Sequence, residues 1–284
     1  ADNPLVVVGT ALVIIAMSFK IAVVPFHMWT PDVYTGAPTP VTGFLSGAAK
    51  AAGFAVFVRI FLTGIPLESE NWDNLLWILA VLTMTVGNVM ALRQNEVKRM
   101  LAFSSIAHAG YVMVAVVVGS TSAISGVIFY SCAYALMGTG AFGILTIRDA
   151  GTIPKTFDDL AGYGKRNPFL ALLMTLFIFS LVGLPLTGGF IGKLQIFSAA
   201  LQDGWIWLTV IGILNSALSV YYYLRVVMYM YMREGALPEG SDDSNKTYGF
   251  ALTGLIGTAV AVLYLGVFPD QILELASESI RALL

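Results

Sequence analysis

The stretch GTALVIIAMSFKIAVVPFHMW, from Gly9 to Trp29, decides the fold because it reads as a membrane-spanning helix with two interruptions. A helix needs about 20 mainly apolar residues to cross the hydrocarbon core of a bilayer. Within this apolar run stand a lysine, Lys20, and, five residues later, a proline, Pro25. A charge inside the membrane is costly and a proline breaks the helical hydrogen bonds, so neither suits a helix that faces only lipid. Lys20 and Pro25 together therefore indicate a functional site inside a membrane protein.

The rest of the chain has the composition of a membrane protein. Of its 284 residues, 57% are hydrophobic and 11% are charged, whereas soluble domains carry about 25% charged residues. The apolar runs are continuous, which argues against the alternating pattern of a β-barrel. They predict an all-α transmembrane bundle in a single domain, residues 1–284. The expected spans are about 5–28, 41–63, 72–93, 97–118, 123–147, 168–202, 205–232 and 248–268.

One of these spans is too long to be a single straight helix. The run from Phe169 to Leu201 would extend about 50 Å, against a hydrocarbon core of about 30 Å. Its middle reads VGLPLTGGFIG and holds Gly183 and Pro185. We expect a broken helix here, in addition to the break at Pro25. Two interrupted helices in one bundle are a strong indication of a transport site.

The charges that lie deep in the expected spans are all cationic: Lys20, Lys50 and Lys193. A buried cation must face protein or water rather than lipid. Lysine suits proton transfer, because loss of water and a neighbouring cation both favour its neutral form. We therefore interpret the three lysines as a proton relay, which His108 in the fourth span extends. The alternatives are a packed, hydrogen-bonded role for His108 and, for Lys20, a side chain that reaches towards the headgroups.

Residues that bind metals or redox groups are scarce. Cys132 is the only cysteine, and His27 and His108 are the only histidines. These are too few for an iron–sulfur cluster or a typical zinc site. We therefore expect no cofactor, no bound metal and no redox centre in this chain. The net charge of −2 argues against a nucleic-acid partner.

Lysine and arginine concentrate in alternate loops. The third, fifth and seventh loops carry them, whereas the second, fourth and sixth carry none. By the positive-inside rule we expect the odd-numbered loops in the cytoplasm, and both ends of the chain on the periplasmic side of the cell inner membrane. Residues 270–284 follow an amphipathic pattern and predict a short helix on that outer surface. Its apolar face would hold Ile272, Ala276, Ile280 and Leu283.

Three motifs resemble the antiporter-like, proton-conducting membrane subunits of respiratory complex I: KIAVVPFHMWTPDVYTGAPTPVTGFLSGAAKAAGF, KRMLAFSSIAHAGY and SLVGLPLTGGFIGKLQIF. The resemblance covers nearly the whole chain and implies an inverted-repeat fold whose C-terminal helices are the eight spans expected here. It implies that Lys20 is the lysine of one broken helix, Lys50 the connecting lysine, and Lys193 the lysine of the second broken helix. The implied function is proton translocation, coupled to quinone reduction in other subunits of an NADH-quinone oxidoreductase.

The resemblance also implies partners. The family pairs the lysine of the first broken helix with a glutamate on a helix that is absent from these residues. We therefore expect the N-terminal half of the same subunit, other membrane subunits of the complex and the lipid bilayer as partners. Two alternatives stay open. The chain is a subunit of a multi-subunit sodium/proton antiporter, which shares these motifs, or a non-conducting membrane scaffold.

Overall fold

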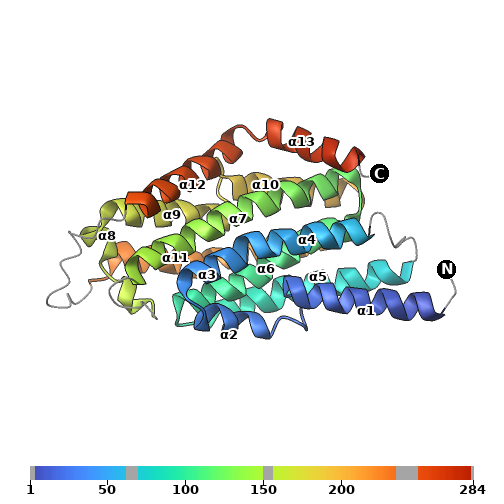
Figure 1. Cartoon of the computed structure of the whole chain (residues 1–284), viewed down its shortest axis with the longest axis horizontal. Helices are drawn as coiled ribbons and strands as arrows, with labels where there is room; N and C mark the ends of the chain where they lie inside the picture. Colours follow the sequence, from blue (N-terminus) through green and yellow to red (C-terminus); the bar gives the residue numbers. More distant parts are fainter. Residues whose placement is uncertain (1–3, 62–69, 150–155, 235–248, 283–284) are drawn as a thin grey trace.

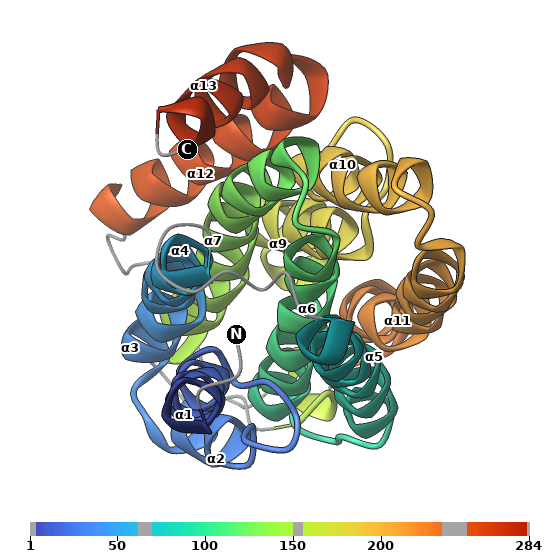
Figure 2. The same cartoon turned by 90° about the vertical axis from the view of Figure 1, so that its right-hand side faces the viewer.

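The computed structural model describes residues 4–61, 70–149, 156–234 and 249–282, and its long elements in these ranges are helices that lie side by side (Figures 1 and 2). Seven helices of the described part are long and apolar enough to cross a membrane. The all-α bundle expected from the apolar runs is confirmed. The helices are α1 (Pro4–Ile21), α2 (Trp29–Gly36), α3 (Thr39–Phe44), α4 (Lys50–Arg59), α5 (Glu70–Leu92), α6 (Val97–Val118), α7 (Thr121–Asp149), α8 (Tyr163–Arg166), α9 (Pro168–Val182), α10 (Gly188–Gln202), α11 (Ile206–Met232), α12 (Gly249–Val267) and α13 (Asp270–Arg281).

Helices α6 and α7 form the centre of the bundle, and the other helices pack around them (Figure 2). In α6, 94% of the apolar window is buried, compared with 22% in α1. Ser104, Ser105 and His108 of α6 are all buried. The serines and the histidine of SSIAHAGY therefore lie in the middle of the bundle and not at its surface.

The first break begins earlier than Pro25 predicts. Helix α1 ends at Ile21 because Ala22 adopts a left-handed conformation, with φ of 62°. Such a residue commonly ends a helix, and here the amide of Val23 bonds back to the Ser18 carbonyl at 2.8 Å. Pro25 then lies in a turn before α2, a short helix that occupies part of the expected connection.

The second break lies at the predicted residues. Helix α9 ends at Val182, capped by Gly183 with φ of 90°, and α10 starts at Gly188. Pro185 is in the turn between them, where no helical amide is required. The long apolar run is thus two helices of 15 residues each.

Close packing between the two half-helices depends on a glycine. A Cβ atom placed on Gly189 would overlap the backbone carbonyl oxygen of Ser180 in α9. We expect Gly189→Ala to lower the melting temperature of the assembled complex, because a backbone atom cannot move aside. Overpacking of this kind costs about 1–3 kcal/mol. Gly254→Ala is the matched control, because nothing lies within 4 Å of its added methyl group. Equal melting temperatures for the two variants would contradict this packing.

The C-terminal amphipathic segment is a helix that packs on the bundle. Helix α13 lies against α7 and buries Ala276 and Ile280, which belong to the expected apolar face. Ile272 packs beside the same surface, and Leu283 lies outside the described residues. The start of α1 and the end of α13 are at the same end of the bundle (Figure 1).

At the opposite end of the bundle, two of the basic loops contact α11. The guanidinium of Arg225 donates to the Gln94 carbonyl at 3.0 Å and lies 4.1 Å from the ring centre of Phe157. Arg233 lies 3.7 Å from Asp158. These contacts connect the third and fifth loops to the end of α11. Arg225 therefore has a structural role at this end of the bundle.

Candidate functional site

Lys50 is held in the bundle centre by the backbone and side chain of one serine. It follows directly after a π-helical turn, η1 (Leu45–Ala49), that links α3 to α4. Single π-turns are often found at functional positions. The Lys50 side chain is 4% exposed, and its Nζ donates to the Ser105 carbonyl at 2.8 Å and to the Ser105 Oγ at 2.5 Å.

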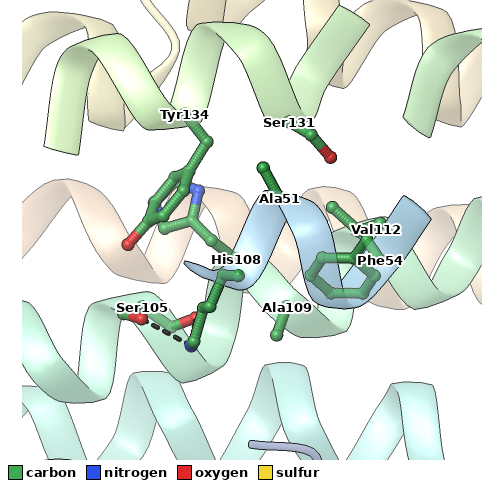
Figure 3. A pocket seen from close by; sticks show the side chains of 9 residues that line it. Ala51, Phe54, Ser105, His108, Ala109, Val112, Ser131 and Tyr134 are labelled. Atoms are coloured by element: carbon green, nitrogen blue, oxygen red, sulfur yellow. Dashed lines mark hydrogen bonds between the residues drawn. The ribbon is translucent and has the colours of Figure 1, made fainter. Parts of the chain in front are cut away.

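A small cavity adjoins Lys50, with both polar and apolar side chains in its lining. Ser105, His108, Ser131 and Tyr134 contribute to its lining (Figure 3). The cavity has room for about one water molecule. The Ser131 hydroxyl is buried and lacks a hydrogen-bond partner among the described residues. A cavity of this size suits one water molecule beside the Ser131 hydroxyl.

Both ring nitrogens of His108 are engaged. Nδ1 lies 2.5 Å from the hydroxyl of Tyr130, and Nε2 lies 2.8 Å from the hydroxyl of Tyr223. The Tyr223 hydroxyl also bonds to that of Ser104. A neutral imidazole needs one donor and one acceptor on its two sides, and a tyrosine hydroxyl serves as either. The histidine is therefore packed and hydrogen-bonded, and its neighbours accept either tautomer.

Lys193 is held by the carbonyl groups that the second break leaves free. It lies on α10, and its Nζ donates to the carbonyl oxygens of Leu181 and Val182 at 3.1 and 2.8 Å. The last carbonyls of a helix have no partner within the helix and carry the negative end of its dipole. A third bond goes to the Ser216 Oγ at 3.0 Å. The break thus supplies uncharged carbonyl oxygens that bind a buried ammonium group.

A network of tyrosines and asparagines extends from Lys193 into α5 and α11. The Nζ of Lys193 lies 5.0 Å from the ring centre of Tyr111. The Asn88 side chain donates to the Tyr111 hydroxyl at 3.1 Å and accepts from the Tyr222 hydroxyl at 2.8 Å. It also donates to the Asn215 Oδ1 at 3.2 Å. These residues were missed in the sequence, although amides in the middle of apolar spans are a signal that was available.

Lys20 lies apart from this axis. Its side chain is exposed on α1, next to exposed apolar residues such as Phe19. Its stem is near α4, because a Cβ built on Gly53 would lie 3.6 Å from the Lys20 Cγ. The structure therefore brings Lys50, His108 and Lys193 into one buried polar axis, and leaves Lys20 at the surface of the described residues.

The fold and the axis together define a class of protein. Two broken helices, each accompanied by a lysine, inside a bundle of membrane-spanning length are features of an ion-translocating membrane subunit. The family model described as "NADH:quinone oxidoreductase/Mrp antiporter, TM" matches residues 1–219. The chain belongs to this family.

Two curated relatives are named as subunits of NADH-quinone oxidoreductase. "NADH-quinone oxidoreductase subunit N" of Trichlorobacter lovleyi is 50% identical over 282 residues, which are 99% of this chain and 57% of that protein. "NADH-quinone oxidoreductase subunit N 1" of Solibacter usitatus is 45% identical over 280 residues, which are 98% of this chain and 57% of that protein. The chain therefore spans a little more than half the length of these relatives.

Solved structures of two kinds of complex share the fold. A chain of respiratory complex I from Thermus thermophilus superposes with a TM-score of 0.82 at 33% identity, over 96% of this chain and 60% of that one. A chain of the Mrp complex from Dietzia sp. superposes with a TM-score of 0.88 over 97% of this chain and 59% of that one. Its identity of 24% shows the fold alone.

Proposed function

We propose that this chain is part of a subunit N of NADH-quinone oxidoreductase and moves protons across the membrane while other subunits reduce quinone. The names of its relatives support this assignment. The observation that carries the mechanism is the buried axis of Lys50, His108 and Lys193, whose side chains lie in the interior of the bundle.

The partners of the two buried lysines suit proton transfer. Within the described ranges, Lys50 and Lys193 bond to serine hydroxyls and backbone carbonyls and to no carboxylate. A carboxylate would stabilise the ammonium form strongly and hold its proton. Neutral acceptors orient the amine and stabilise its charge less, so the charged and neutral forms differ less in free energy.

The proposed path runs along the axis. Lys20 receives the signal from the neighbouring part of the subunit, and its stem beside α4 places it next to the Lys50 end. Lys50 passes a proton to His108 across the small cavity that both side chains line. Lys193 then receives it and releases it on the periplasmic side, where both ends of the chain would lie. The basic loops at the opposite end would face the cytoplasm.

Lys20 should have a carboxylate partner outside this chain. An exposed cation on an apolar membrane helix costs about 2.5–3.5 kcal/mol on insertion scales, so lipid is a poor neighbour for it. The buried hydroxyls of Ser18 and Thr30 and the His27 Nδ1, around the first break, also lack partners among the described residues. We expect a glutamate from the N-terminal half of the subunit within about 4–6 Å of the Lys20 Nζ, the range in which an opposite charge acts strongly.

A structure of the complete complex checks this expectation. A carboxylate beside Lys20, directly or through one water, would support a switch in which a removable counter-charge controls the lysine. Apolar side chains alone around the Lys20 Nζ would contradict it.

Transport by the intact complex in liposomes tests the proposed function. We expect NADH-driven proton uptake to continue in sodium-free medium, because the two buried lysines offer ammonium groups and no carboxylate for a metal cation. Uptake that stops without sodium would favour the multi-subunit sodium/proton antiporter. A scaffold would be favoured if removal of either buried lysine left the proton count unchanged.

A further inference from the structure

His108 and Lys193, which follow one another on the proposed proton path, are not in direct hydrogen-bond contact. Three acceptors take up the Nζ of Lys193, and an ammonium group has three N–H donors. The two nitrogens of His108 are both occupied by tyrosine hydroxyls. Neither group has a free position for the other. A proton that crosses between them must wait until one of these bonds opens.

Tyr111 is the side chain that both groups contact. Its ring centre lies 5.0 Å from the Lys193 Nζ and 5.5 Å from the centre of the His108 ring, which it meets edge-on. The Tyr111 side chain is fully buried. A phenol ring presents an apolar body to its neighbours. The ring is thus next to both groups and presents an apolar body to them.

Asn88 fixes the position of this ring. Its amide donates to the Tyr111 hydroxyl, and also to the Met84 carbonyl at 2.9 Å in its own helix. The Asn215 side chain, itself bonded to the Ile211 carbonyl at 3.0 Å, fixes the amide from α11. Buried polar groups that are fully bonded hold a unique arrangement. Tyr111 is therefore held from α5 and α11 as well as by its own helix, α6.

We propose that Tyr111, positioned by Asn88, is the barrier that keeps His108 and Lys193 from exchanging protons until the Lys193 ammonium moves off the ring. The proposal rests on the proposed function. Such a barrier would give the transfer a direction. In the resting state a proton on His108 or on Lys193 would not return along the path. Tyr111 is a positioning residue, because it orients and separates the groups that carry the proton.

The test is Tyr111→Leu in the intact complex in liposomes, with no NADH present and a pH gradient imposed. We expect proton leak to rise clearly above that of the wild type, because the smaller leucine leaves space for water between His108 and Lys193. Phe129→Leu is the matched control, because Phe129 is equally buried but belongs with Ala133 and Leu265 to a hydrophobic cluster separate from the one that holds Tyr111. Asn88→Leu should raise the leak in the same direction, and it serves if Tyr111→Leu fails to assemble.

A second substitution separates a barrier from a packing defect. Adding His108→Leu to Tyr111→Leu should return the leak to the wild-type rate, because the open path then ends at residue 108. A leak that persists in the double variant, or a single variant that leaks no more than Phe129→Leu, would overturn the proposal. Loss of pumping on removal of Lys193, combined with a tight Tyr111→Leu complex, would reject the barrier and keep the proposed function. Normal pumping without Lys193 would reject the proposed function itself.

Discussion

Replacing Lys50 by methionine is expected to produce a complex that assembles and reduces quinone but no longer moves protons through this chain. Methionine has a similar length and no charge, so the packing around Ser105 changes little, although Ser105 loses the two hydrogen bonds that it accepts from Lys50. Loss of a positioned proton-transfer group lowers a transfer rate by about 10²–10⁴-fold. Proton uptake by liposomes, measured together with NADH oxidation, gives the two rates separately.

Lys50→Arg is the informative companion. Arginine keeps the positive charge but does not lose its proton in proteins. A relay therefore fails in this variant as well, although the cation is present. Restored pumping in an assembled Lys50→Arg complex would show that Lys50 supplies only a fixed charge, and would contradict a transfer role.

The second large effect is expected for Lys193→Glu. The carbonyl oxygens of Leu181 and Val182 point at residue 193 from the end of α9, and they can only accept hydrogen bonds. An ionised glutamate can only accept as well, and the negative end of the helix dipole repels it. We expect Lys193→Glu to lose pumping completely and to assemble less well than Lys193→Met.

Comparing Lys193→Glu with Lys193→Met tests the contribution of the carbonyl groups at the break between α9 and α10. Lys193→Met should lose pumping with near-normal assembly, because it removes the proton carrier without adding a charge. The amount of assembled complex in the membrane and the proton uptake per NADH measure the two effects. Equal assembly of both variants would contradict the assignment of the α9 carbonyl groups as the seat of the ammonium group.

The sequence predicted the elements of this fold well, because apolar length and the positions of glycine and proline are local signals. The span expected at 97–118 is α6, residue for residue. The break at Gly183 and Pro185 followed from a run too long for one helix. Helix α1, by contrast, ends at Ile21 and not near Pro25, since Ala22 takes a conformation that alanine rarely adopts.

The sequence indicated the buried lysines of the candidate site, but not the hydrogen bonds that connect its side chains. Lysines deep in apolar spans are visible in a sequence, and Lys50 and Lys193 lie in the interior. Asn88, Tyr111 and Tyr222 come from three different helices, so which of them meet depends on how those helices are rotated. The exposure of Lys20 on α1 could not be predicted from the sequence either. It depends on which surface of the bundle is left uncovered by the other described residues.

The central claim is that the axis from Lys50 to Lys193 carries protons. The most direct measurement is the number of protons translocated per NADH by the intact complex in liposomes, for the wild type and for Lys50→Met. The account predicts a lower number in the variant at an equal amount of assembled complex. An unchanged number of protons per NADH in a fully assembled Lys50→Met complex would contradict it.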